Sequence, residues 1–182
     1  MTATAEIVED RLIVWSPKEG SELYKLGFYG KPLGIAKPKN ADFDVPLTLD
    51  LIEGAYLLEK GVINVRGPSG EEVQLEELKD IARRFHEGFD KKYAVYRDLR
   101  EKGYVVTPGI KYGCDFAVYQ YGPGIDHAPY IVQVRTEDDE IPASEIVKAG
   151  RLATTVRKTF IIAVPNLREG SVRYLGFKWW KA

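Results

Sequence analysis

The sequence of 182 residues predicts an α+β fold with two domains, a small N-terminal α/β domain and a C-terminal domain with a mixed sheet flanked by helices. Helical and strand patterns alternate in the first half, whereas strands dominate the second half. Between the halves, Gly88 interrupts a helical pattern shortly after His86. We therefore expect domains at residues 1–87 and 88–182.

The composition is typical of a globular protein, with 45% hydrophobic residues. No apolar run approaches the roughly 18 residues that a membrane helix needs. The N-terminal segment lacks the basic start and apolar stretch of a secretory signal. The single cysteine, Cys114, lies in an apolar pattern and is interpreted as a buried small hydrophobe. We therefore expect a cytoplasmic protein without membrane association.

Local signals in the first half indicate where elements begin. Ser16 followed by Pro17 is typical of a helix start, because the hydroxyl can cap the helix and proline tolerates its first position. Thr48-Leu49-Asp50 predicts a second helix start. In order, we expect strand residues in 6–15, a helix from 17 to between 27 and 30, loop and edge strand over 31–45, a helix over 48–60, a strand over 62–65 and a helix over 74–84.

The second half predicts a small mixed sheet with one helix on each side. Its turn signals include Gly103 and Pro165-Asn166, and its last strand extends to Trp179. We interpret the Trp179-Trp180 pair as core or interface residues. In order, we expect a helix over 89–102, strands over 104–107, 114–119 and 130–135, a helix over 142–156, and strands over 160–164 and 172–179.

The net charge of −1 is unevenly distributed. From Ile146 to the C-terminus the chain has eight lysines and arginines and one acid, Glu169, so this segment carries +7 and the remainder −8. A basic terminal segment on an acidic chain indicates a local anionic ligand. Solvated surface charge is the alternative.

The chain is organised around the segment Lys111–Tyr130, which has a phenol and an imidazole at the two ends of a strand–loop–strand unit. A strand pattern stops at Tyr119, a loop rich in glycine and proline follows, and His127 precedes the next strand. This arrangement can place a base and an acid on opposite sides of one scissile bond. An ordinary strand tyrosine and an ordinary loop histidine are the alternatives.

These features resemble one family. The run YGCDFAVYQYGPGIDHAPY, the sequence VRK about thirty residues after the histidine, and a tryptophan-rich C-terminal strand are similar to archaeal tRNA-splicing endonucleases. The helix LTLDLIEGAYLLEKG is similar to one in that family's N-terminal domain. The resemblance implies a tRNA-intron lyase that cuts bulge-helix-bulge RNA without metal or cofactor and leaves 2′,3′-cyclic phosphate and 5′-hydroxyl ends.

The resemblance assigns Tyr119 as general base, His127 as general acid and Lys158 as the cation on the phosphate side. A phenol with a pKa near 10 is a poor base unless a nearby cation lowers that value, and Lys158 can do so while holding the phosphorane oxygens. An imidazole can protonate the departing 5′-oxygen near pH 7. The nucleophile, a 2′-hydroxyl, is already tethered to the substrate, so no metal is required.

The resemblance also implies that Arg151 and Arg173 sandwich a flipped base of the bulge. Arg151 lies seven residues before Lys158, about two helical turns, so we expect the two to share a face. A guanidinium stacks on a base without reading its edges, which suits recognition by shape. Surface charge is the alternative for either arginine.

Two other functions fit parts of the pattern. A non-catalytic architectural subunit of the same complex is disfavoured by the intact Tyr119, His127 and Lys158 set. A metal-dependent DNA nuclease of similar fold would pair Asp115 with an acid and a lysine on the next strand, where this chain has Gln133-Val134-Arg135. We therefore expect no metal site and a structural hydrogen-bonding role for Asp115.

The expected partners are precursor tRNA and further endonuclease subunits. A bulge-helix-bulge has two cut sites and this chain has one catalytic set, so at least two copies must assemble. The resemblance implies four units, docked through an acidic loop between the last two strands. Here that loop, Pro165–Gly170, has one acid and one base. We expect a heterotetramer with a separate non-catalytic subunit, and a homotetramer is the alternative.

Overall fold

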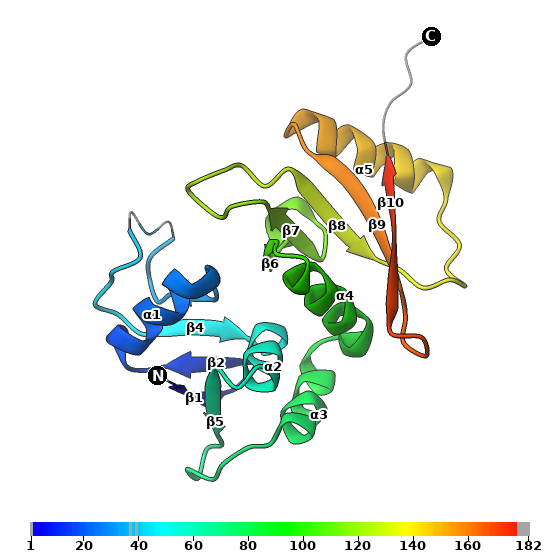
Figure 1. Cartoon of the computed structure of the whole chain (residues 1–182). Coiled ribbons are helices and arrows are strands. Elements are labelled where there is room, and N and C mark those ends of the chain that lie inside the picture. Colours follow the sequence, from blue (N-terminus) through cyan, green and yellow to red (C-terminus); the bar gives the residue numbers. More distant parts are fainter. Residues whose placement is uncertain (1, 37, 39, 178–182) are drawn as a thin grey trace. The chain divides into compact units, whose positions relative to one another are not determined.

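The chain folds into two compact units, Met1–Phe89 and Asp90–Ala182 (Figure 1). The computed structural model describes residues 2–36, 38 and 40–177. Each unit contains a five-stranded sheet within these residues. The predicted two-domain α+β architecture is confirmed. No helix in the described ranges is long and apolar enough to cross a membrane.

The N-terminal unit is a sheet with the strand order β3-β4-β2-β1-β5. The pair β1–β5 is parallel and the other pairs are antiparallel. Its elements are β1 (Ala3–Val8), β2 (Arg11–Val14), α1 (Pro17–Gly27), β3 (Lys31–Pro32), β4 (Leu47–Asp50), α2 (Leu51–Glu59), β5 (Ile63–Arg66) and α3 (Leu75–Phe85).

Helix starts in this unit follow the capping signals, with one correction. Ser16 accepts a hydrogen bond from the backbone of Glu19, and Pro17 occupies the first turn of α1, as predicted. Thr48 and Leu49, predicted to open a helix, belong to β4, whereas Asp50 is the N-cap of α2 and accepts a hydrogen bond from the Ile52 N–H. Alternate residues Leu47 and Leu49 are buried against the core while the strand pairs with β2, and this tertiary pairing delays the helix until Leu51.

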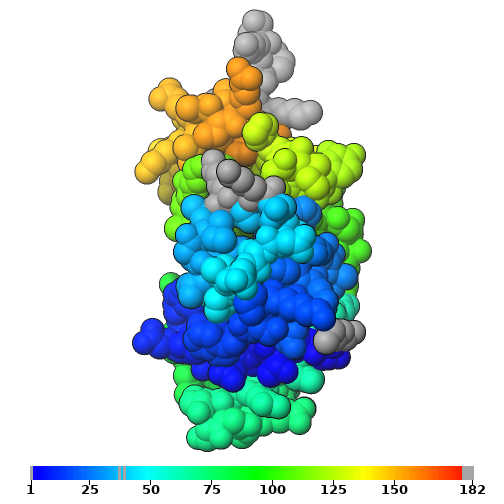
Figure 2. Space-filling view, turned by 90° about the vertical axis from the view of Figure 1, so that its left-hand side faces the viewer, coloured from blue at the N-terminus to red at the C-terminus, as the bar shows by residue number. Residues whose placement is uncertain are grey.

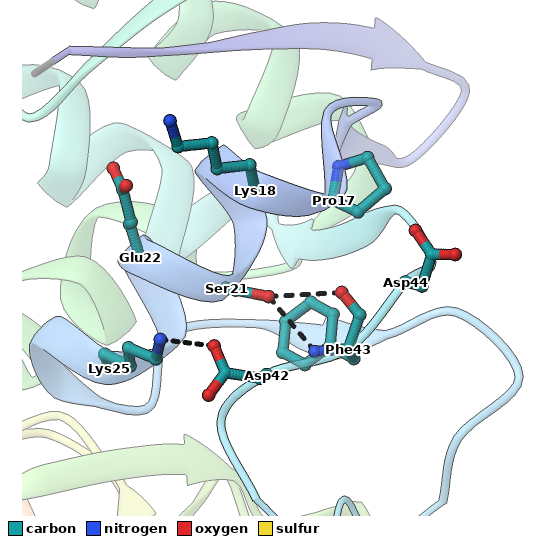
Figure 3. A pocket seen from close by; sticks show the side chains of 8 residues that line it. All are labelled: Pro17, Lys18, Ser21, Glu22, Lys25, Asp42, Phe43 and Asp44. Atoms are coloured by element: carbon teal, nitrogen blue, oxygen red, sulfur yellow. Dashed lines mark hydrogen bonds and ion pairs between the residues drawn. The ribbon is translucent and has the colours of Figure 1, made fainter.

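The described residues between β3 and β4, 33–36, 38 and 40–46, are loop, as predicted, and Figure 2 shows them in light blue to cyan on the surface of this unit. The Ser21 hydroxyl on α1 hydrogen-bonds both the N–H and the C=O of Phe43, each at 3.2 Å. Lys25 pairs with Asp42. These contacts border a groove of about 600 Å³ along α1 (Figure 3).

The C-terminal unit is a sheet with the order β10-β9-β8-β7-β6. The pair β8–β9 is parallel and the others are antiparallel, so the predicted mixed sheet is confirmed. Its elements are α4 (Phe89–Glu101), β6 (Val105–Pro108), the 3₁₀ turn η1 (Ile110–Tyr112), β7 (Phe116–Tyr119), β8 (Tyr130–Val134), α5 (Ala143–Thr155), β9 (Thr159–Asn166) and β10 (Ser171–Phe177).

Two helices cover opposite faces of this sheet. Ala153 of α5 packs with Ile131, Phe160 and Ile162 of the sheet, and α5 runs along β9 (Figure 1). On the other face, the Tyr96 ring of α4 lies 5.9 Å from the Phe116 ring. The predicted helix on each side is therefore confirmed, and the two faces are named here the α5 face and the α4 face.

Strand boundaries in this unit differ from the prediction by one or two residues, and the differences at β9 and β7 are the informative ones. Pro165 and Asn166, predicted to form a turn, belong to β9, and Pro165 pairs with Val172 of β10. Proline has no N–H to donate, but the pairing of β9 with β8 ends at Ala163, so Pro165 needs no hydrogen bond to β8. Cys114 precedes β7, which begins at Phe116. The Trp179-Trp180 pair lies outside the described residues.

Candidate active site

The register of the three central strands brings the predicted catalytic residues to one end of the sheet. Val118 of β7 pairs with Tyr130 of β8, which pairs with Thr159 of β9. Tyr119 is the last residue of β7, His127 lies three residues before β8, and Lys158 directly precedes β9. Residues from three separate stretches of the chain therefore lie at the same end of the sheet.

Tyr119 is half-buried on the α5 face. Ala117, two residues earlier in β7, pairs with Ile131, which packs against Ala153 of α5. Side chains two residues apart in a strand share a face, so Tyr119 is on the α5 face as well. Burial raises the pKa of the Tyr119 phenol above its ordinary value of 10, and the nearby Tyr112 phenol and Asp126 carboxylate add to the rise, while a hydrogen bond with Thr107 opposes it. The expected lowering of this pKa by Lys158 is not found in the free chain.

Lys158 lies over an aromatic ring beside the histidine loop. Its Nζ donates a hydrogen bond to the carbonyl of Ala128, the residue after His127. The same Nζ lies 5.0 Å from the centroid of the Tyr112 ring. The ammonium is therefore held at the loop that carries the predicted acid.

The turn from α5 into β9 sets the direction of Lys158. Arg157 has a φ of 55°, in the left-handed region. The Arg157 N–H bonds Thr154 O and the Lys158 N–H bonds Ala153 O, the pattern of a Schellman motif. The expectation that Arg151 and Lys158 share a helical face is wrong, since α5 ends at Thr155 and Lys158 follows this turn.

His127 is exposed at the end of a loop that one carboxylate closes. The Asp126 carboxylate accepts hydrogen bonds from the N–H groups of Gln120, Tyr121 and Gly122 at 3.0, 3.4 and 2.7 Å. The loop between Tyr119 and His127 thus has a defined path rather than an open one. Asp126, the residue before His127, is therefore hydrogen-bonded to the residues that directly follow β7.

Of the two predicted base-binding arginines, one lies on α5 and the other on β10. Arg151 is exposed on α5. Arg173 of β10 pairs with Val164, which packs on the α5-side core, and its guanidinium forms an ion pair with Glu137. Val164 is six residues along β9 from Lys158, a separation of about 20 Å at the usual rise of a strand.

Asp115 has the structural role that was predicted. Its carboxylate accepts a hydrogen bond from the Val134 N–H at 2.8 Å and pairs with Lys92 at 3.1 Å. Burial and the neighbouring Asp115 charge raise the pKa of the Cys114 thiol to about 11, so Cys114 is a neutral, partly buried group. Within the described ranges, no three histidine, cysteine or acidic residues cluster as metal ligands.

Two residues that contact the predicted catalytic residues or their loop were not predicted from the sequence. The Tyr112 ring lies under the Lys158 ammonium, and the Asp126 carboxylate closes the loop that precedes His127. Aspartate is common in turns because its carboxylate bonds nearby backbone N–H groups, so its place in a loop rich in glycine was the available signal for Asp126. Tyr112 has no such local signal, because its partner is distant in the sequence.

Comparison with known proteins identifies the family. The model for the N-terminal domain of tRNA intron endonucleases matches residues 3–79, and the model for their catalytic C-terminal domain matches residues 89–174. The tRNA-splicing endonuclease of Hyperthermus butylicus is 50% identical over 171 residues, with 94% of each chain covered. That of Sulfurisphaera tokodaii is 46% identical over 177 residues, with 97% of this chain and 98% of the relative covered. The resemblance and the prediction of an enzyme are confirmed: the chain belongs to the tRNA intron endonuclease family and carries its catalytic domain.

Proposed function

We propose that this chain is the catalytic subunit of a tRNA-splicing endonuclease that cuts introns of precursor tRNA at bulge-helix-bulge motifs without a metal ion. The observation that carries the proposal is the convergence of Tyr119, His127 and Lys158 at one end of the C-terminal sheet. The proposed products are a 2′,3′-cyclic phosphate and a 5′-hydroxyl. Such an enzyme needs a base, an acid and a cation but no external nucleophile.

In the proposed reaction the 2′-hydroxyl next to the scissile phosphate is the nucleophile. Its proton passes to the Tyr119 phenolate as the O2′–P bond forms. The P–O5′ bond breaks, and the His127 imidazolium gives its proton to the departing 5′-oxygen. Lys158 stabilises the charge that develops on the non-bridging oxygens. The exposed position of His127 at the loop end suits contact with a leaving strand.

The two arginines serve in this proposal as a grip on a flipped base rather than as catalytic groups. Arg173 and Arg151 both lie on the α5 side of the sheet, which is compatible with one base between them. Arg173 lies beside Val164, and the backbone of Val164 is about 20 Å along β9 from Lys158. In this proposal the base held by Arg173 is therefore not the nucleotide cleaved at the same chain's Lys158.

The decisive test uses a pre-folded bulge-helix-bulge RNA with a single 2′-deoxy substitution at one cleavage site. We expect that site to resist cleavage while the unmodified site is cut, because the nucleophile is missing. Cleavage of the unmodified site should persist in EDTA. A 2′-deoxy site cut at the normal rate, or complete inhibition by EDTA with the RNA still folded, would contradict the proposal and favour a metal-dependent nuclease.

The pH dependence of a His127→Ala variant should report on the phenol. Because burial raises the pKa of Tyr119 above 10, phenolate is scarce at neutral pH, and its fraction grows about tenfold per pH unit below that pKa. Residual single-turnover cleavage by His127→Ala is therefore expected to keep increasing with pH through about pH 10. The double variant Tyr119→Phe with His127→Ala supplies the background. A plateau below pH 9 would exclude the buried phenol as the base.

Replacing Asp126 should impair catalysis through the loop. In Asp126→Ala, three backbone N–H groups lose their acceptor, and we expect the imidazole to be misplaced and the single-turnover rate to decrease about 10- to 100-fold, with RNA affinity nearly unchanged. Asp139→Ala is the matched control, since Asp139 also caps a backbone N–H, that of Thr136, in an exposed loop. Equal rates for both variants would show that Asp126 does not position His127.

The proposed assembly is a heterotetramer of two copies of this chain and two non-catalytic subunits. Removing an intron requires two cuts and each chain has one catalytic set, so two copies are the minimum. The turn after β9 contains Arg168 beside Glu169, and Asn166 accepts hydrogen bonds from the N–H groups of both. A turn of balanced charge suits docking into a basic pocket poorly.

Light scattering of the isolated chain, combined with a cleavage assay, tests this assembly. We expect the chain alone to be smaller than a tetramer and weakly active, and to gain full activity when an acidic-loop subunit is added. A stable and fully active tetramer of this chain alone would establish the homotetramer instead.

A further inference from the structure

We infer that Tyr112 is a positioning residue for Lys158, because its ring and the Ala128 carbonyl together hold the ammonium where the phosphate must bind. This inference rests on the proposed role of Lys158. Lys158 Nζ donates to Ala128 O and lies 5.0 Å from the centroid of the Tyr112 ring. A cation at this distance from the face of a tyrosine is attracted by the negative charge of the ring face.

The Tyr112 ring is itself well placed to act as a support. Tyr112 is the last residue of η1, and its N–H bonds to the carbonyl of Gly109 at 2.8 Å. Gly113 follows with a φ of 65°, a left-handed conformation that favours glycine and reverses the chain toward β7. The ring packs on the cluster formed by Ile131 and Phe160. Tyr112 is therefore anchored at both its backbone and its ring.

Both supports of the ammonium are electrically neutral. A lysine ammonium has three N–H donors, and the Ala128 carbonyl takes one of them. Among the described residues, no ion pair involves Lys158, so no carboxylate offsets its charge. The arrangement fixes the position of the lysine while leaving its positive charge and further donors for the oxygens of a phosphate.

A second lysine lies near the Tyr112 ring. Lys111 lies 5.9 Å from the centroid of the same ring, but it is exposed, and Lys158 is closer.

A double-mutant cycle separates positioning from general stability. Tyr112→Phe keeps the ring face and should retain wild-type single-turnover kcat within about threefold, whereas Tyr112→Leu should lower kcat about tenfold with KM unchanged. In a Lys158→Ala background, Tyr112→Leu should cause no further loss, because its effect passes through Lys158. Equal losses from Tyr112→Leu in both backgrounds, or a Tyr112→Phe variant as slow as Tyr112→Leu, would overturn the inference.

Two controls use neighbours of Tyr112. Lys111→Ala removes the other cation near the ring and should leave kcat unchanged at saturating RNA. Cys114→Ala loosens the same apolar cluster and should reduce thermal stability without changing kcat. A loss of kcat in Cys114→Ala equal to that in Tyr112→Leu would also overturn the inference. Failure of the proposed function is distinguishable, since wild-type protein would then cut the 2′-deoxy site or Lys158→Ala would cleave at the wild-type rate.

Discussion

The parallel pairing of β8 with β9 is the constraint on which the site depends. Parallel neighbours cannot be joined by a hairpin, so the chain must cross over, and α5 with its closing turn provides the crossover. The register that joins Tyr130 to Thr159 brings Lys158 level with the loop before β8, where its ammonium reaches Ala128. A slip of one residue would turn Lys158 to the α4 face and away from Tyr112.

Local features of the site could be predicted from the sequence because their causes are local. The end of β7 at Tyr119 is visible where an apolar pattern meets glycine and proline, and His127 follows within the same stretch. The start of α1 was predictable for the same reason, because the Ser16 hydroxyl bonds the N–H of Glu19, only three residues later in the sequence. Lys158 required the family resemblance, because a parallel register is set by strands and a helix far apart in the chain.

The features that were missed depend on partners that sequence patterns do not identify. Residues 47–50 form a strand because β2 lies beside them, and Pro165 stays in β9 because β8 has already ended. The pKa of Tyr119 was expected to be lowered by a cation, but burial of the phenol raises it, and the nearby Tyr112 and Asp126 add to the rise. Burial is a property of the packed sheet, so counting charges along the sequence could not give its sign.

Arg173 and Lys158 are held in two different ways, and the difference matches their proposed tasks. Arg173 is paired with Glu137, so it must exchange a carboxylate for a base before it can grip RNA. Because that pair is exposed, the exchange costs little. Lys158 rests on a carbonyl and an aromatic ring, which leave its charge available. An incoming phosphate would itself oppose ionisation of Tyr119. The Lys158 ammonium, which forms no ion pair within the described part of the chain, lies on the same face and can offset both charges.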